Sequence, residues 1–210
     1  MRRTALGLAG LALAGCQPPA PAWPSELEAQ AGLCSAVHVI RLRERDSATP
    51  PGSFDAFLQI LHYAMIASAR GRERIELRAL DSVSRRAGVA QVELREQDWQ
   101  ARVADCAAAF PEARRPAGRL PEAPFEAGMI CFGLADFVAR TAADFPREAV
   151  AASDLAERAL AAAAPELTRQ ARTNDEAERL GERYRVRAFL AGTPSSLLDQ
   201  CAQRFPVRAG

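Results

Sequence analysis

Lysine is absent from this 210-residue chain, so all 27 of its basic residues are arginine. This absence excludes a lysine Schiff base and the lysine of a nucleotide-binding P-loop. The chain also has no glycine-rich phosphate loop, no G-x-S-x-G, no H-E-x-x-H and no C-x-x-C motif. The motifs therefore give an enzymatic function no positive support, and a thioredoxin-like redox pair is not indicated.

Aromatic residues are scarce, at 6% of the chain, whereas hydrophobic residues make up 49%. A core built mostly from alanine, leucine and valine favours closely packed helices over a β-sandwich, whose strands are rich in β-branched and aromatic residues. The formal charge is +1. A nearly neutral surface gives no electrostatic reason to expect a nucleic-acid partner.

The N-terminus has the organisation of an export signal. Met1, Arg2 and Arg3 form a short positive segment, and residues 5–14 form an apolar run that is too short to span a membrane. The run ends at Leu13-Ala14-Gly15-Cys16. An ordinary secretory leader or a buried apolar helix is the alternative interpretation.

This tetrapeptide resembles the lipobox of bacterial lipoproteins, and the resemblance covers residues 1–16 only. It implies that residues 1–15 are a signal peptide and that Cys16 becomes a lipidated N-terminus. Position 17 is glutamine, not the aspartate that favours retention in the inner membrane of enteric bacteria. The resemblance therefore implies attachment to the inner leaflet of the outer membrane, facing the periplasm, through lasting acyl anchorage.

Residues 16–30 are expected to form a tether, because four prolines in the segment 17–24 prevent a helix or central strand. A polyproline-like spacer of this length would reach roughly 25 Å. Trp23 would either sit at the membrane interface or pack on the first folded unit.

A short stretch occurs twice, as Cys106-Ala-Ala-Ala-Phe-Pro111 and as Cys201-Ala-Gln-Arg-Phe-Pro206. Cys34 precedes the first copy by 72 residues, and Cys131 precedes the second by 70. The matching separations indicate a duplicated unit. Once Cys16 is set aside for lipid, four cysteines remain in an oxidising compartment, and four cysteines allow three pairings. The repeat selects Cys34–Cys106 and Cys131–Cys201.

We therefore predict an all-α protein of two tandem helical bundles, each of about four helices and each closed by one disulfide. Unit 1 covers residues 31–111, a proline-rich linker covers 112–124, and unit 2 covers 125–206. No family resemblance is identified for the mature part of the chain.

Local patterns place the helix boundaries of unit 1. Ser53 is expected to cap a helix with a sustained apolar stripe, and Asp98 the helix that carries Cys106. Ile75, Leu77 and Ala79 alternate, so a short strand pairing with residues 92–95 is possible and residues 75–95 could form a hairpin. A helix is preferred, and Asp81 or Ser82 is expected to restart a helix that runs toward Arg95.

In unit 2 the expected helices cover residues 125–145, 147–163, a segment after Pro165, and a third helix from Asn174 that Gly192 ends. Thr193 and Pro194 are expected to open the last helix.

The candidate chemical residues are few. His38 and His62 are the two histidines, and His38 lies four residues after Cys34, but a zinc site needs three or four convergent ligands. We predict no metal and no cofactor. Asp136 and Asp144 are the acid–base candidates, because they lie in or near an apolar helix.

Three functions remain open. The preferred one is a non-catalytic binding or accessory module of the cell envelope with a protein or envelope partner, for which the groove between the units could be the interface. The alternatives are an envelope hydrolase or lyase that uses carboxylates such as Asp136, and a carrier of a small apolar ligand among the small residues at 159–164. A deep pocket with two converging acids would distinguish the enzyme.

Overall fold

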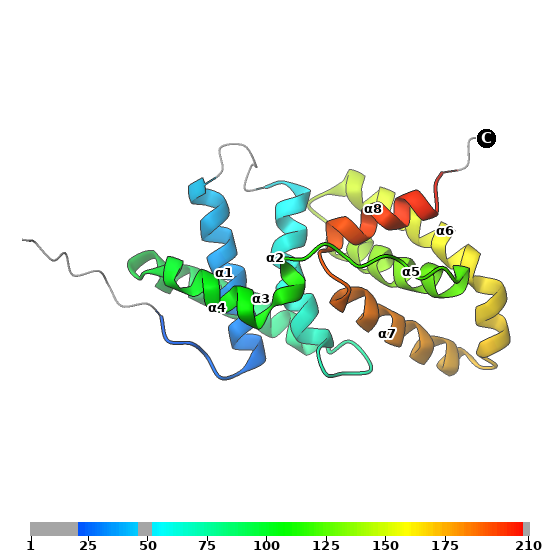
Figure 1. The fold of residues 1–210 in the computed structure, drawn as a ribbon, viewed down its shortest axis with the longest axis horizontal. Helices are drawn as coiled ribbons and strands as arrows, with labels where there is room; N and C mark the ends of the chain where they lie inside the picture. The colour runs from blue at the N-terminus through cyan, green and yellow to red at the C-terminus, as the bar shows by residue number, and fades with distance from the viewer. Residues whose placement is uncertain (1–20, 46–51, 208–210) are drawn as a thin grey trace, which may run out of the picture.

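The computed structural model describes residues 21–45 and 52–207, and within these ranges its regular structure is entirely helical. The all-α prediction is confirmed. The described α-helices divide into α1 to α4 and α5 to α8. Figure 1 shows these two groups one after the other along the longest axis, with unit 2 at the end where the chain is yellow to red. The leader, Cys16 and most of the turn expected at residues 47–52 lie outside the described residues.

Unit 1 consists of α1 (Leu27–Arg45), α2 (Phe54–Ala69), α3 (Leu77–Glu93) and α4 (Arg102–Ala109). The cap predicted at Ser53 is present, since its side chain accepts a hydrogen bond from the backbone N–H of Ala56. Asp98 likewise accepts from the N–H of Gln100, at the start of a 3₁₀ turn (Trp99–Ala101) that leads into α4.

Residues 75–95, for which a hairpin was the alternative, contain the helix α3, so the preferred helical interpretation is confirmed. The predicted start at Asp81 or Ser82 is wrong, however, because α3 already begins at Leu77. Glu76 is its N-cap residue and makes no side-chain cap hydrogen bond. Its backbone N–H bonds to the carbonyl of Ser68 instead. A tertiary hydrogen bond to the end of α2 thus fixes the residue before this helix. The capping preferences of residues 76–82 could not predict the helix start, because this contact is not local.

Unit 2 consists of α5 (Pro124–Thr141), α6 (Pro146–Gln170), α7 (Asn174–Leu190) and α8 (Pro194–Arg204). The predicted break at Pro165 is wrong, because α6 continues through it. A proline removes one helical hydrogen bond and leaves the carbonyl four residues earlier unpaired. That carbonyl belongs to Ala161, which is exposed, so water can satisfy it.

Helix α5 stops at Thr141, four residues before the predicted end at Phe145. Phe145 precedes a proline, which disfavours the helical conformation. Its ring packs against Phe54 and Phe57 of α2, with centroid distances of 5.6 and 5.3 Å. An aromatic contact with unit 1 therefore accompanies the early end of α5.

Both predicted disulfides are present. Cys34 is bonded to Cys106 and Cys131 to Cys201, so each joins the first helix of a unit to the last. The repeated stretches also end their helices alike. Phe110 and Phe205 each donate a backbone hydrogen bond to the carbonyl of the cysteine four residues earlier, at 3.0 and 2.9 Å. The duplicated sequence therefore corresponds to a duplicated local structure.

The two units share a core. The largest hydrophobic cluster contains the buried residues of α5 to α8 together with Leu58, Met65 and Ala69 of α2. A second cluster joins α1, α2, α3 and α4. Because α2 contributes to both, the units are packed against each other through one helix.

The linker between the units is fixed to unit 2. The N–H of Thr193 donates to the carbonyl of Arg115 at 2.9 Å, and the N–H of Gly118 donates to the carbonyl of Ala191 at 3.2 Å. Gly192 lies at this crossing with φ of 136°, and a Cβ there would be 2.6 Å from Ala117. Gly192 thus has a packing role as well as ending α7.

Close packing of α5 on α6 accounts for the small residues at 159–164. Ala159 and Ala163 are fully buried, and a Cβ added to Gly128 would lie 2.7 Å from the carbonyl oxygen of Ala159. These alanines allow two helix backbones to approach, so they do not by themselves indicate a ligand cavity.

We expect Gly128→Ala to lower the free energy of unfolding by about 2 kcal/mol, because backbone atoms must move to admit the methyl group. Gly181→Ala is the matched control, since nothing lies within 4 Å of its added Cβ. It should raise stability by about 0.5–1 kcal/mol through helix propensity. Urea denaturation measures both, and equal effects of the two substitutions would contradict the packing argument.

Candidate functional site

The two histidines are structural in position. The Nε2 of His38 lies 2.8 Å from Oε1 of Gln59, and the Nε2 of His62 lies 3.1 Å from the carbonyl oxygen of Phe189. In residues 21–45 and 52–207, no group of three or more potential ligands could hold a metal ion. The structure thus does not bring Cys34 and His38 into a metal centre, because Cys34 is in a disulfide.

The acid–base candidates are not brought together either. Asp136 accepts hydrogen bonds from Arg140 at 2.7 Å and from Arg185 at 3.3 Å, which ties α5 to α7. Asp144 is exposed in the turn after α5. Two arginine partners satisfy the carboxylate of Asp136, so its contacts are those of an ion pair between helices.

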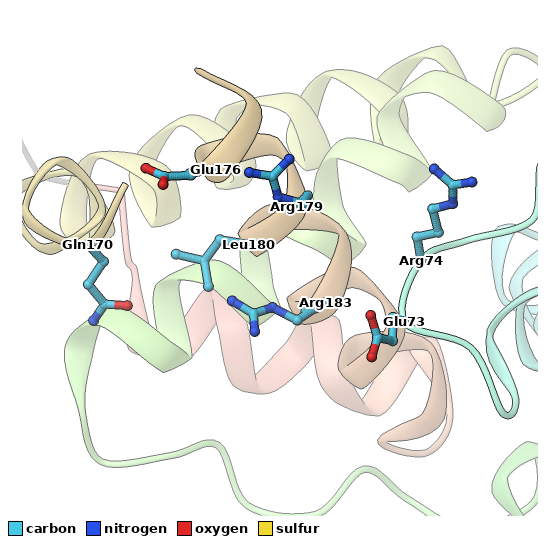
Figure 2. A pocket seen from close by; sticks show the side chains of 7 residues that line it. All are labelled: Glu73, Arg74, Gln170, Glu176, Arg179, Leu180 and Arg183. Atoms are coloured by element: carbon cyan, nitrogen blue, oxygen red, sulfur yellow. The ribbon is translucent and has the colours of Figure 1, made fainter. Parts of the chain in front are cut away.

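A pocket of about 510 Å³ lies at the junction of the two units. Its lining comes from the loop before α3, from the end of α6 and from one side of α7: Glu73, Arg74, Gln170, Glu176, Arg179, Leu180 and Arg183. Figure 2 shows these side chains around the space between the three segments. A pocket lined from both units is therefore present, and its charged lining was not predicted.

Helix α7 presents its pocket residues on one side, because positions 176, 179, 180 and 183 recur at helical spacing. A capping box fixes its first turn. Thr173 accepts a hydrogen bond from the N–H of Glu176, whose carboxylate accepts from the N–H of Thr173. The predicted start at Asn174 is confirmed, although the T-x-x-E pattern at 173–176, which was visible in the sequence, was not identified as its cap.

The loop opposite α7 is held at several points. The side chain of Arg72 forms ion pairs with Glu28 and Glu76. The N–H of Ile75 donates to a carboxylate oxygen of Glu182 on α7, at 3.2 Å. These contacts of Arg72 and Ile75 hold Arg74 across the pocket from α7. The side chain of Arg74 takes no part in them.

The pocket has arginines that are free to bind. Arg74, Arg179 and Arg183 form no ion pair with a described carboxylate, as is also true of exposed arginines outside the pocket such as Arg147. All three pocket arginines are exposed to solvent. Guanidinium groups bind carboxylates and phosphates through paired N–H donors. The pocket is therefore suited to an anionic group.

The two glutamates of the pocket do not form a catalytic pair. Glu176 is occupied by its capping hydrogen bonds to the N–H groups of Arg172 and Thr173, at 2.7 and 3.2 Å. Figure 2 shows Glu73 on the loop side and Glu176 on the far side of Arg179, so their carboxylates do not converge. Acid–base catalysis on a single bond needs convergent groups.

Comparison with protein-family models finds no match for this chain. Comparisons with curated proteins and with solved structures also find none. Among the described helices, none combines the length and the apolar character that a membrane span requires.

Proposed function

We propose that this protein is a lipid-anchored component of the bacterial cell envelope that binds an anionic partner and catalyses no reaction. Cys16 carries the lipid, on the outer membrane and facing the periplasm. The partner is a protein or another envelope component, and nucleic acid is not its ligand. The lipobox resemblance supports the anchor, and the two disulfides are consistent with an oxidising compartment.

The observation that carries the binding role is the group of three arginines without carboxylate partners in the pocket between the units. Arg185, which ties α7 to α5, has Asp136 and Glu182 as partners. The three pocket arginines are exposed and have no carboxylate partner among the described residues, so their guanidinium groups are open to a ligand. The arginines belong to two units, since Arg74 is in unit 1 and the others are in unit 2. A partner bound there would contact both.

A hydrolase or lyase is less well supported. Asp136 is engaged by Arg140 and Arg185, and the two glutamates of the pocket lie at separate places in it, with Arg179 between them. A carrier of an apolar ligand is also less well supported, because the small residues of α6 are used in helix packing.

Cys16→Ser should abolish incorporation of a radiolabelled fatty acid into the protein expressed with its leader in a bacterial host. The substituted protein should also leave the membrane fraction. Neutral hydroxylamine treatment after labelling is the control, because it removes acyl chains held by a thioester and leaves the thioether and amide linkages of a lipoprotein intact. Fatty-acid incorporation that persists in the Cys16→Ser protein would contradict the anchor.

Arg179→Gln combined with Arg183→Gln should weaken binding of a fluorescent oligoglutamate peptide on the order of tenfold, because two charge-assisted contacts are lost. Fluorescence anisotropy measures the affinity, and added salt should weaken wild-type binding as well. The matched control is Arg147→Gln, on an exposed arginine of α6 outside the pocket. Equal loss in the control, or no binding by the wild type, would contradict an anion site.

A pull-down from detergent-solubilised envelopes with the same variants then identifies the natural partner. A partner recovered equally by the wild type and the double variant would place the binding surface elsewhere.

A further inference from the structure

The end of the tether is docked on unit 1. The carbonyl of Pro21 accepts a hydrogen bond from the side chain of Arg102, and the carbonyl of Pro24 accepts one from Gln30 at 2.9 Å. Trp23 is half-buried and packs against both smaller hydrophobic clusters. From Pro21 onward the tether is therefore part of the folded unit. Trp23 packs on unit 1, which is one of the two positions predicted for it from the sequence.

Docking shortens the free part of the tether. Five peptide units separate Cys16 from Pro21, so the chain between them spans at most about 17 Å. The expected reach of roughly 25 Å assumed that all the residues before Pro24 were free. If Cys16 is lipidated, the side of unit 1 around Pro21 lies close to the membrane.

That side of unit 1 exposes two apolar side chains among charged ones. Val89 and Val92 of α3 are 59% and 65% exposed, and they are two of only five large hydrophobic residues exposed in the described chain. Val89 also lines a groove of about 440 Å³ together with Pro21, Pro24 and Leu33, and the charged residues Arg85, Arg86 and Glu93 form part of its wall. The described chain therefore begins beside an uncovered apolar part of α3.

Figure 1 shows that the blue start of the described chain and unit 2 lie toward opposite ends of the longest axis. Helix α7, which carries most of the arginine pocket, belongs to the distant half. A membrane next to the start of the chain would thus leave α7 and the pocket accessible.

We propose that the face of α3 formed by Arg85, Val89 and Val92, together with the groove beside Pro21, lies on the surface of the phospholipid bilayer to which Cys16 is anchored. This inference rests on the proposed lipid anchor. It adds an orientation: unit 1 sits on the lipid, the valines enter the headgroup region, and unit 2 extends away from the membrane.

The charges around this face are balanced. Arg78, Arg85 and Arg95 are exposed, and so are Asp81, Glu93 and Glu96. Arg86 is paired with Glu26 at 2.7 Å. Contact would therefore depend on apolar burial and only weakly on anionic lipid, because no net positive patch attracts the membrane.

The test uses the chain from Cys16 to Gly210, which contains every described residue. Since the other four cysteines are in disulfides, Cys16 can be coupled chemically to a maleimide phospholipid and placed on vesicles of neutral phosphatidylcholine. Hydroxyl-radical footprinting then compares this protein with one whose Cys16 carries N-ethylmaleimide. Oxidation of Val89 and Val92 should fall several-fold on vesicles. Val150 and Val207, the exposed valines of unit 2, should be unchanged.

A second measurement uses coupling to a single myristoyl-length chain, whose own membrane binding is weak and reversible. Val89→Ser with Val92→Ser should reduce partition into the vesicles by about tenfold, because two partly inserted apolar side chains are lost. Val150→Ser with Val207→Ser is the matched control and should have no effect. Replacing part of the neutral lipid with phosphatidylglycerol should change partition little.

Unchanged footprints at Val89 and Val92, or equal partition of the two double variants, would overturn the proposal. Protection of the valines that appears without lipid and grows with protein concentration would also overturn it, since it would identify a second copy of the chain as the occupant. Because the lipid is attached chemically, these results do not depend on lipidation in the cell. Failure of the anchor in the Cys16→Ser experiment and failure of the membrane face are therefore distinguishable.

Discussion

Removing the disulfide between Cys34 and Cys106 by a double substitution to alanine is expected to lower the free energy of unfolding by about 4 kcal/mol. The bond closes a loop of 72 residues, so its loss restores a large amount of conformational freedom to the unfolded chain. Both cysteines are buried, and alanine leaves no unsatisfied polar group in their place. Urea denaturation of the oxidised wild type and the variant gives the difference.

The effect should extend across both units. Leu58, Met65 and Ala69 of α2 belong to the core cluster of unit 2, so unfolding of one unit exposes part of the core of the other. Both tryptophans, Trp23 and Trp99, lie before the linker. Tryptophan fluorescence therefore follows unit 1, whereas far-ultraviolet circular dichroism follows the helices of both units.

Removing the second disulfide, between Cys131 and Cys201, should accordingly shift the fluorescence transition as well as the dichroism transition to lower urea. Two separate transitions, with the fluorescence midpoint unchanged, would show that the units unfold independently. Peptide mapping of the unreduced protein checks the starting point: residue 34 must be linked to residue 106.

Acidification should destabilise the protein through His62. This side chain is only 1% exposed, and burial lowers its pKa from 6.5 to about 4, although the hydrogen bond to Phe189 and the charge of Glu112 act in the opposite direction. Since a carbonyl can only accept, the Nε2 carries the proton. The Nδ1 has no hydrogen-bond partner, so a second proton there would be buried and unpaired.

The direction of the effect follows from the two pKa values. Above pH 6.5 the histidine is neutral in both the folded and the unfolded chain, and its contribution is constant. As the pH falls from 6.5 to about 4, the unfolded chain binds a proton that the folded chain excludes. The free energy of unfolding should therefore fall by about 3 kcal/mol over this window.

The His62→Gln variant separates this effect from that of the carboxylates, because glutamine can still donate to Phe189 but does not titrate. Its stability should depend less on pH than that of the wild type. His38→Gln is the matched control, and it should remove a smaller part of the pH dependence, since burial also lowers the pKa of His38. A His62 ring resonance that titrates near 6.5 in the nuclear magnetic resonance spectrum would contradict the argument.

The sequence determined the features that depend on residues close together in the chain or on a repeated spacing. The caps at Ser53 and Asp98 and the proline at the start of α8 are local, so they could be predicted. The disulfides are long-range, but the repeat reduced three possible pairings to one. The capping box at Thr173 was equally readable from the sequence, although it was not predicted.

The predictions that were wrong concern features that depend on contacts between distant segments. The helical path through Pro165 depends on which side of α6 faces solvent, and the early end of α5 coincides with an aromatic contact between Phe145 and α2. The arginine pocket could not be predicted because its lining residues lie about 100 positions apart, as Ile75 and Glu182 do across their hydrogen bond.

By itself, then, the sequence determined an all-helical chain of two similar halves, because helix periodicity, caps and cysteine spacing are properties of single segments and of their repetition. Only the tertiary structure decided that α2 belongs to both cores and that His62 is sealed against Phe189. It also decided which arginines were left without acidic partners. These outcomes follow from burial and contact across more than 100 residues, and burial is fixed only when the whole chain packs.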